Sequence, residues 1–372
     1  MRITNIDCFL VRLPYTPTMT RTTDKQGLFN AARSLNPTLD ALLVRVETDS
    51  GLTGWGEAFG HACNPASMAL LSGLLAPFFT GEKCDDIEAL MQKAHYAFHS
   101  YGRGGAMMYA LSALDIALWD LRGKAENLPL WKLLGGTRSQ VELYPSLASF
   151  DGNATKLMEC INPLIKKGYR HIKLHERDPQ AIVEVAQALP DEVTLMVDTN
   201  CAWNAQQAEE FLPQLHAAGV DFVEEPTFPP ENISQLRYLR QMTGARVAAG
   251  ENFNNSEEFA LSMALNAVDV LQPSVAKIGG VSAVLDIIKH ARAHENVSLL
   301  PHCFYYGPGL LASAHLLSVL PKPVPLEVPW LMFEQTLHPF MRFQPVMDLP
   351  QAPGLGFTPD IDVLERHLIA KE

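Results

Sequence analysis

Three carboxylates recur along the middle of the chain, and each ends a short apolar run: Asp198 in LMVDTN, Glu224 in DFVEEP and Glu251 in VAAGEN. The intervals from 198 to 224 and from 224 to 251 are 26 and 27 residues. This spacing predicts consecutive βα units, in which the carboxyl ends of parallel strands open into one shared mouth. Three carboxylates that converge there repel one another unless a divalent cation joins them, and a site with only oxygen ligands suits Mg²⁺. The pattern therefore predicts a metal-dependent enzyme built on a barrel.

Length and charge limit the classes of protein that fit. A chain of 372 residues has room for two domains, one of which can be a full barrel of about 250 residues. The net charge of −12 argues against nucleic acid and anionic membrane surfaces as partners. An acidic substrate remains open, because a bound metal can invert the local field. We expect a small-molecule carboxylate substrate, no nucleic-acid or membrane partner, and assembly into a homo-oligomer.

The cysteines and the apolar segments indicate the compartment. The six cysteines form no CxxC pair and do not cluster, so they predict free thiols in a reducing compartment and not a disulfide framework or a zinc site. Asp7 and Arg12 interrupt the first apolar stretch, which argues against a signal peptide. Asp115 and Asp120 interrupt the apolar segment Ala106–Leu121, so we expect no segment as long as a membrane span. We therefore expect a soluble, cytoplasmic protein.

The pattern of the chain changes near residue 125. Before it, the runs Ile3–Leu13 and Leu42–Thr48 predict a small antiparallel sheet, and three helical stretches follow. After it, strands and helices alternate. The strands expected there are Val141–Ser146, His171–His175, Thr194–Asp198, Phe222–Glu224, Val247–Glu251, Val268–Gln272, Ser298–His302 and Leu326–Val328. Eight strands at this spacing favour a closed parallel barrel, with an open doubly wound sheet as the alternative.

Two further features bear on this organisation. No glycine-rich phosphate fingerprint follows any expected strand, which argues against a nucleotide-binding Rossmann unit. After Pro329 the chain is rich in loop residues, and we expect this tail to return to the N-terminal domain. The predicted division is an N-terminal α+β capping domain over 1–125, a catalytic barrel over 126–329 and a C-terminal tail over 330–372.

Several motifs together resemble a known family. They are the carboxylate triad, ALSALDIALWDLRGK (Ala110–Lys124), VAKIGG (Val275–Gly280) and PGLG (Pro353–Gly356). In these motifs and their order, the chain resembles the enolase superfamily, in the branch of mandelate racemase and muconate lactonizing enzyme, over nearly its whole length. The resemblance implies a (β/α)7β modified TIM barrel, an α+β capping domain formed from the N-terminal segment and the C-terminal tail, and one Mg²⁺. It also implies that catalysis begins by removal of the proton next to a substrate carboxylate.

The chemistry of such a reaction explains what the site must contain. A proton α to a carboxylate is weakly acidic, because its removal puts a second negative charge on an existing anion. A metal on the carboxylate oxygens stabilises the resulting enediolate as a Lewis acid, and a preorganised hydrogen-bond donor adds to this. A base must lie within hydrogen-bonding reach of the α-carbon on the correct face.

Lys173 and His175 are the first candidates for proton transfer. They occupy alternate positions of one expected strand, in HIKLHE, so both side chains point to the same side. In the resembling families this motif is Lys-x-Lys, with the first lysine near the substrate carboxylate and the second as base. Here the second position is His175, and histidine is neutral and basic near pH 7 without the depressed pKa that a lysine needs. The alternative is that His175 only hydrogen-bonds a neighbour.

His302, in SLLPHCF, ends the seventh expected barrel strand on the opposite side of the barrel. In mandelate racemase-like enzymes this histidine pairs with an aspartate, and the corresponding residue here is Ser274. A serine can orient the ring but cannot stabilise an imidazolium by charge. We therefore expect His302 to be a weak base and a better general acid. Lys277, three residues after Ser274, is expected to support the metal shell from outside.

Two further polar residues are candidates near the metal. Glu327, in PLEVPW, ends the eighth expected strand, and the resemblance implies a protonated carboxyl there that donates to the substrate carboxylate. The alternative is a glutamate outside the substrate contacts. Asn200 lies two residues after Asp198 and is expected to hydrogen-bond a metal ligand or the substrate. Glu225 follows Glu224 on the opposite strand face, so we do not expect it to be a ligand.

Substrate specificity is expected to come from the capping domain. The stretch Thr16–Ser34 is polar and lacks periodicity, as a lid does, and Trp55–Pro65 is a second expected contact region. Tyr305 and Tyr306 follow His302 and are expected to line the pocket. The charged candidates in the first stretch, for which an ordinary solvated loop is the alternative, are Arg21, Asp24 and Lys25.

Three functions fit this set of residues. A dehydratase of a hydroxylated carboxylate, such as a sugar acid, needs a base and a different group for the departing hydroxyl, and unlike groups on the two sides suit that asymmetry. A racemase or epimerase needs two competent bases, and the serine at 274 weakens this alternative. A catalytically silent relative that only binds metal is the third, and the complete triad argues against it.

Overall fold

The structure, a computed structural model, describes residues 1–16 and 38–372. Its N-terminal part is built on a long antiparallel pair, β1 (Ile3–Thr16) and β2 (Thr38–Thr48), with β3 (Thr53–Ala58) beside β2. Alternate side chains of a strand point to opposite faces. On β1 one set packs towards the barrel, with Phe9 and Val11 in the larger core, and the other packs against the capping helices. The pair therefore separates two hydrophobic cores.

The capping domain is packed around α4 (Gly105–Ala125), the helix that contains the ALSALDIALWDLRGK motif. Both faces of α4 are buried, and β3 approaches it so closely that a Cβ at Gly56 would lie 1.8 Å from the Ala113 carbonyl oxygen. Gly54 meets Ala117 in the same way, at 2.2 Å. The small residues on the two elements are therefore what allows this contact. The capping helices are α1 (Asn64–Leu70), α2 (Ala76–Phe79), α3 (Ile87–Phe98) and α4 (Gly105–Ala125).

The helical run His61–Phe79 corrects one sequence expectation. It has 19 residues and a mean hydropathy of 1.3, so by length and composition alone it is long and apolar enough to cross a membrane. The run is helical throughout, with 3-10, α and π turns in succession, and its residues Met68, Leu71 and Leu75 pack into the capping core. This packing buries 33% of the apolar window and therefore accounts for part of its apolar character.

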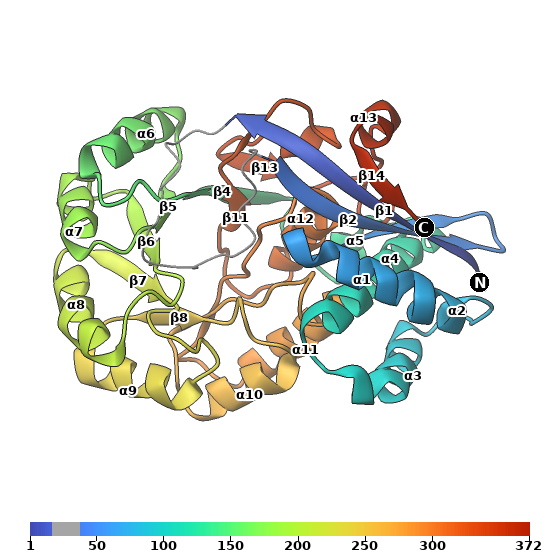
Figure 1. Cartoon of the computed structure of the whole chain (residues 1–372), viewed down its shortest axis with the longest axis horizontal. Helices are drawn as coiled ribbons and strands as arrows, with labels where there is room; N and C mark the ends of the chain where they lie inside the picture. The colour runs from blue at the N-terminus through green and yellow to red at the C-terminus, as the bar shows by residue number, and fades with distance from the viewer. Residues whose placement is uncertain (17–37) are drawn as a thin grey trace.

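The second sheet contains eight parallel strands in the order β10-β9-β8-β7-β6-β5-β4-β11, and it curls into a barrel surrounded by helices (Figure 1). Its strands are β4 (Gln140–Leu147), β5 (His171–His175), β6 (Thr194–Asp198), β7 (Val220–Glu224), β8 (Val247–Ala249), β9 (Val270–Leu271), β10 (Ser298–Leu299) and β11 (Leu326–Pro329). The alternation of strands and helices and the parallel order confirm the predicted modified TIM barrel with a capping domain. Among the described residues no ladder joins β10 to β11, and the Cys303 backbone N–H donates to Glu327 Oε2 across this seam at 3.0 Å.

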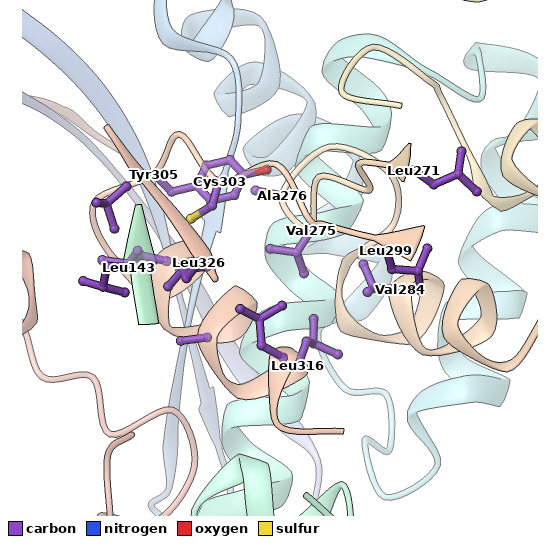
Figure 2. Packing of buried hydrophobic residues seen from close by; sticks show 14 of the residues in the cluster. Leu143, Leu271, Val275, Ala276, Val284, Leu299, Cys303, Tyr305, Leu316 and Leu326 are labelled. Carbon is purple, nitrogen blue, oxygen red and sulfur yellow. The ribbon is translucent and has the colours of Figure 1, made fainter. Parts of the chain in front are cut away.

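The register of the barrel strands brings their last residues together. His175 is paired with Asp198, and Asp198 with Glu224, along three adjacent strands. Below this level Tyr144, Met196, Phe222, Ala248, Val270 and Leu300 fill the barrel interior. The larger core lies between the strands and the outer helices, and Figure 2 shows part of it around β10, β11 and α12. The polar ends of the strands therefore rest on a packed apolar layer.

Helices alternate with the barrel strands and begin at clear sequence signals. Five of them follow an Asn or Asp whose side chain accepts a backbone N–H of the first turn: α6 (Ala154–Lys167), α7 (Pro179–Ala188), α8 (Ala205–Ala217), α9 (Ile233–Thr243) and α10 (Ser256–Ala264). The other helices of this part are α5 (Leu130–Leu133), α11 (Gly280–Ala291) and α12 (Pro308–Leu317).

The C-terminal segment contacts both sheets. β12 (Met332–Phe333) and β14 (Leu368–Lys371) pair with β1, and β13 (Val346–Asp348) pairs with β4 of the barrel. The helix α13 (Ile361–Arg366) precedes β14. The end of the chain thus lies on the N-terminal sheet, and the division at residues 125 and 329 stays a prediction.

Candidate active site

The carboxylates of Asp198, Glu224 and Glu251 meet at the mouth of the barrel. Asp198 ends β6, Glu224 ends β7 and Glu251 lies two residues beyond β8, and one oxygen of each lies within 4.8 Å of the others. Burial, together with the nearby charge of Asp198, raises the pKa of Glu224 well above its usual value. Glu224 Oε1 is buried without a hydrogen-bond partner among the residues that the structure describes. Crowded anions with an unpaired buried oxygen fit ligation of a divalent cation with oxygen ligands.

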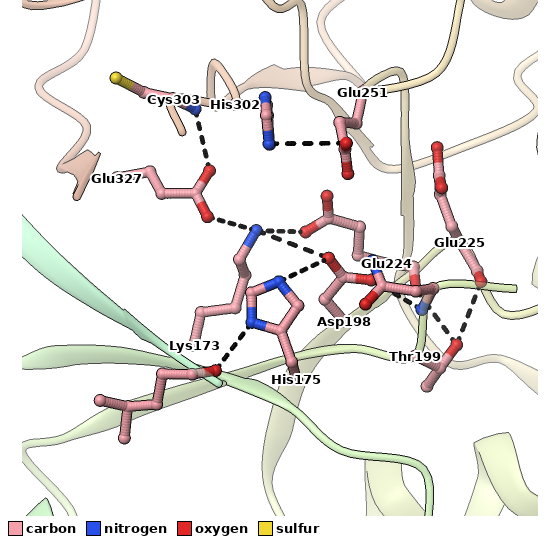
Figure 3. Close-up of polar contacts among 12 residues, drawn as sticks. Lys173, His175, Asp198, Thr199, Glu224, Glu225, Glu251, His302, Cys303 and Glu327 are labelled. Carbon is pink, nitrogen blue, oxygen red and sulfur yellow. Dashed lines mark hydrogen bonds and ion pairs between the residues drawn. The ribbon is translucent and has the colours of Figure 1, made fainter. Parts of the chain in front are cut away.

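Lys173 lies fully buried among these carboxylates (Figure 3). Its Nζ is 2.9 Å from Glu224 Oε2, 2.6 Å from Glu327 Oε1 and 3.9 Å from Asp198 Oδ2. Burial by itself lowers the pKa of Lys173, but the charges of Glu224 and Glu327 raise it well above its usual value. The side chain is therefore an ammonium, which suits binding of a substrate carboxylate better than proton abstraction.

Glu327 is held ionised by the same contact. Its Oε2 accepts the Cys303 N–H, and its other oxygen faces Lys173. Burial raises the pKa of Glu327, but the positive charges of Lys173 and His302 lower it below its usual value. This arrangement favours a carboxylate, in contrast to the protonated carboxyl that the resemblance implies.

His175 and His302 flank the triad at its two ends (Figure 3). His175 Nε2 is 3.3 Å from Asp198 Oδ2, and its Nδ1 is 2.7 Å from the Leu147 carbonyl oxygen. Burial lowers the pKa of His175, but its hydrogen bond with Asp198 and the charge of Asp198 raise it above its usual value. A carbonyl oxygen can only accept, so Nδ1 carries a hydrogen and donates it to Leu147.

His302 has a different set of neighbours. Its Nε2 is 3.7 Å from Glu251 Oε1, and its Nδ1 is 3.0 Å from Ser274 Oγ. Burial lowers the pKa of His302. Ser274 also hydrogen-bonds the hydroxyl of Tyr305. Ser274 therefore lies where the sequence put the partner of His302.

The remaining candidates near the metal are also brought to the triad. The Asn200 backbone N–H donates to Asp198 Oδ1 at 2.8 Å, so this residue supports a ligand through its main chain. Lys277 Nζ is 3.4 Å from Glu251 Oε1 and 2.9 Å from Asn252 Oδ1. Glu225 lies outside the triad and accepts from Asn252 Nδ2 at 2.8 Å.

The residues expected to give substrate specificity fall into two groups. The candidates Arg21, Asp24 and Lys25 lie in 17–37, outside the described residues. Tyr305 is 2% exposed and Tyr306 is 1% exposed, and both line a small pocket together with Phe59, His61 and Phe304.

Aromatic residues that the sequence analysis did not single out lie beside the histidines. The Phe304 ring is 6.4 Å from the His175 ring and 5.9 Å from that of His61, and the Phe59 ring is 6.1 Å from that of His302. Phe59 and His61 belong to the expected contact loop Trp55–Pro65. The only signal for Phe304 was its position two residues after His302.

Two sequence families match the chain. The family described as Enolase C-terminal domain-like matches residues 156–363, and the one described as Mandelate racemase / muconate lactonizing enzyme, N-terminal domain, matches residues 19–135. The two matches cover the barrel and the capping domain in turn.

Individual relatives carry names from sugar-acid chemistry. A D-galactarolactone cycloisomerase of Agrobacterium fabrum is 29% identical over 87% of this chain and 90% of its own. An L-talarate/galactarate dehydratase of Salmonella typhimurium is 28% identical over 95% of this chain and 88% of its own. The crystal structure of L-talarate dehydratase from Polaromonas sp. JS666, complexed with Mg and L-glucarate, has a TM-score of 0.81 and 25% identity, and covers 100% of this chain and 98% of that one.

Proposed function

The chain belongs to the enolase superfamily, in the branch of mandelate racemase and muconate lactonizing enzyme, and we propose that it is a Mg²⁺-dependent dehydratase of a hydroxylated carboxylate such as a sugar acid. Its relatives are named dehydratases and cycloisomerases, so the chain is an enzyme of the lyase or isomerase class. The observation that carries the dehydratase proposal is the unlike pair of histidines: His175 beside Asp198 with a carbonyl behind it, and His302 beside Glu251 with a serine behind it.

Asp198, Glu224 and Glu251 would hold the cation. Their mutual distances and the unpaired oxygen of Glu224 support this assignment. When bound, Mg²⁺ supplies Lewis-acid stabilisation of the negative charge that develops on the substrate carboxylate. Lys277 and the Asn200 N–H keep two of the ligands in place through their hydrogen bonds.

Three side chains carry out the remaining steps of substrate binding and proton transfer. The Lys173 ammonium attracts the substrate carboxylate and stabilises added negative charge on it. His175 takes the proton from the α-carbon, and the electron pair of that C–H bond forms the new C=C bond as the C–O bond to the β-hydroxyl breaks. His302, at the other end of the triad, assists departure of the hydroxyl, which leaves as water. One proton is removed and one is consumed, so the reaction needs no co-reactant, and the enol product becomes a keto acid.

Racemisation or epimerisation is the second candidate, because two histidines flank the same triad. It requires both to accept a proton, and Ser274 provides no charge to support His302 in that role. The cycloisomerase name of one relative adds ring opening or closure of a lactone to the isomerase alternatives. Cytoplasmic location and assembly into a homo-oligomer stay predictions.

A screen of hydroxylated carboxylates in D₂O with Mg²⁺ tests the proposal. Elimination produces a keto acid, whereas epimerisation exchanges the α-hydrogen for deuterium, and NMR detects both. We expect keto acid from at least one sugar acid, and a loss of roughly 10²–10⁴-fold in its rate in His175→Asn. His216→Asn, at an exposed position of α8, is the matched control and should keep the wild-type rate. Exchange from both faces without keto acid would instead establish the racemase alternative.

A further inference from the structure

We propose that Tyr305 and Ser274 form a hydrogen-bond relay that holds the hydrogen of neutral His302 on Nε2, so that His302 is a fixed donor towards the substrate and His175 is the only base of the site. The role towards the substrate rests on the proposed function, whereas the position of the hydrogen does not. Tyr305 and Ser274 are then positioning residues that keep the His302 hydrogen on Nε2. An aspartate at position 274 would instead hold the hydrogen on Nδ1.

The relay begins at an obligatory donor. Tyr305 is buried beside His302, with the ring centroids 6.1 Å apart, and its hydroxyl oxygen lies next to Ala276 (Figure 2). The hydroxyl has one hydrogen-bond partner among the described residues, Ser274 Oγ. A tyrosine hydroxyl carries a hydrogen, and that buried hydrogen has an acceptor only if Tyr305 donates it to Ser274.

The direction of hydrogen-bond donation at Tyr305 then determines the direction at Ser274 and at His302. Ser274 Oγ has one hydrogen, and when it accepts from Tyr305 it donates that hydrogen to His302 Nδ1, 3.0 Å away. A neutral imidazole carries one N–H, so Nδ1 as acceptor leaves the hydrogen on Nε2. This N–H lies at the mouth of the barrel, 3.7 Å from Glu251 Oε1.

Reversal of the relay is unfavourable. A hydrogen on His302 Nδ1 would have to be donated to Ser274, and Ser274 would then donate to Tyr305. The Tyr305 oxygen would then accept from Ser274, and its own hydrogen would be buried without an acceptor among the described residues. Leaving a buried donor unsatisfied costs more than a hydrogen bond contributes when it is made.

His175 has the opposite arrangement. Both of its ring nitrogens face acceptors: Nδ1 is 2.7 Å from the Leu147 carbonyl oxygen, and Nε2 is 3.3 Å from Asp198 Oδ2. The shorter contact keeps a hydrogen on Nδ1, so neutral His175 has its lone pair on Nε2. The two histidines therefore differ in kind. His175 offers a lone pair that can take the α-proton, and His302 offers an N–H that can bind the departing oxygen. In the elimination the proton taken up by His175 is the one that the hydroxyl needs to leave as water.

The hydrogen positions can be measured without a substrate. We suggest ¹⁵N labelling of the histidine rings in the full-length protein saturated with Mg²⁺, with one-bond and long-range ¹H–¹⁵N correlations to identify each tautomer. Signals of His302 are assigned by their loss in His302→Gln. His315 is an internal reference for a hydrogen on Nε2, because its Nδ1 accepts the Trp131 N–H and its Nε2 faces the Leu355 carbonyl oxygen. His99 is the reference for the other tautomer, because its Nδ1 is 2.8 Å from the Tyr96 carbonyl oxygen, which only accepts.

We expect wild-type His302 to carry its hydrogen on Nε2. Tyr305→Phe should lower the ratio of this tautomer to the other about fivefold, the effect of one net hydrogen bond, and Ser274→Asp should move the hydrogen to Nδ1. Tyr306→Phe is the matched control, because the hydroxyl of this neighbouring buried tyrosine has no hydrogen-bond partner among the described residues. It should leave the His302 pattern unchanged. A hydrogen on Nδ1 in the wild type would overturn the relay.

A second measurement separates the relay from the proposed function. Glutamine at 302 offers an amide N–H but no base, so His302→Gln should retain more elimination activity than His302→Leu on any acid that the D₂O screen identifies. If the NMR pattern is as expected but no keto acid forms from any acid, the relay stands and the dehydratase proposal falls. If keto acid forms but His302→Gln is as inactive as His302→Leu, the donor role of His302 is wrong.

Discussion

The three carboxylates at the barrel mouth repel one another until a cation joins them, and this can be tested one residue at a time. We expect Glu224→Gln to lower the affinity for Mg²⁺ by at least about tenfold. Losses of this size occur even when the mutated residue only hydrogen-bonds a metal ligand. Without Mg²⁺ the same variant should be as stable as the wild type or more so, because the pKa of Glu224 is raised by burial and by Asp198, and its charge is therefore unfavourable there. Isothermal titration calorimetry and thermal unfolding check the two statements.

Glu225→Gln is the control for this prediction. Glu225 is also buried and also next to the triad, but it accepts from Asn252 and lies outside the group of ligands. It should keep most of the Mg²⁺ affinity. Equal losses in both variants would mean that net charge, and not ligation by Glu224, controls binding.

At the scale of residues, the sequence predicted the positions of those side chains whose direction follows from the alternation along a strand. Spacing identified the triad, and alternation put Lys173 and His175 on one side of β5. It could not predict the hydrogen-bond partners of the histidines. The Leu147 carbonyl reaches His175 through the register of β4 and β5, and Tyr305 reaches Ser274 through the fold of two loops. Such contacts depend on backbone positions that residue type does not encode.

At the scale of elements, Glu57 joins the capping domain to the barrel. It lies on β3, is 3% exposed, and its carboxylate accepts the N–H groups of Gly307 and Gly309 at 3.0 and 2.9 Å, at the start of α12. Burial raises the pKa of Glu57 from 4.5 to about 7, although these N–H groups oppose the rise. The folded state thus binds this proton more tightly than the unfolded chain.

The sign of the pH effect follows from linkage. Stability contributed by protonated Glu57 is fully present below pH 4.5 and is lost as the pH rises through 7. The shift corresponds to roughly 3 kcal/mol. We expect the free energy of unfolding to fall over this window less steeply in Glu57→Gln than in the wild type, as measured by urea unfolding at several pH values. Glu88→Gln, at an exposed position of α3, should retain the wild-type slope. An unchanged slope in Glu57→Gln would contradict the assignment.

The element boundaries show where sequence patterns are informative. β5 and β6 have the predicted bounds, because apolar alternation ends at their functional residues. β8, β9 and β10 are shorter than predicted. Glu251, Ser274 and His302 all lie beyond the ladders of these strands, so the chain leaves the sheet before it presents them. The sequence stays hydrophobic beyond the last paired residue, so hydrophobicity alone does not show where each strand ends.

For the whole molecule, the barrel and its cap could be predicted because the motifs that indicate them are spread along most of the sequence. The seam between β10 and β11 could not be predicted, since it concerns strands at the two ends of the sheet order. The role of His315 was also hidden. This histidine has no motif of its own, yet it joins parts of the chain that are far apart in sequence.

His315 lies fully buried on α12 and connects three segments. Its Nδ1 accepts the backbone N–H of Trp131 on α5, and its Nε2 is 3.1 Å from the carbonyl oxygen of Leu355 in the PGLG motif. A protonated ring would carry a hydrogen on Nδ1, directly opposite the Trp131 N–H. Burial accordingly lowers the pKa of His315 from 6.5 to about 4. The contact is compatible with the folded state only while the ring is neutral.

Acid should therefore loosen the molecule through this residue. Because the folded pKa is below the unfolded one, the stability that neutral His315 contributes is present above pH 6.5 and is lost as the pH falls through 4. The full shift corresponds to about 3 kcal/mol. We expect His315→Gln, whose amide can both accept and donate, to be less stable than the wild type at pH 7.5 but to lose less stability between pH 6.5 and 4. Thermal unfolding at fixed pH values measures this. His290→Gln, at an exposed position of α11, should follow the wild type throughout. If His315→Gln loses stability as steeply as the wild type, the acid sensitivity arises from other buried groups and His315 is only a packing residue.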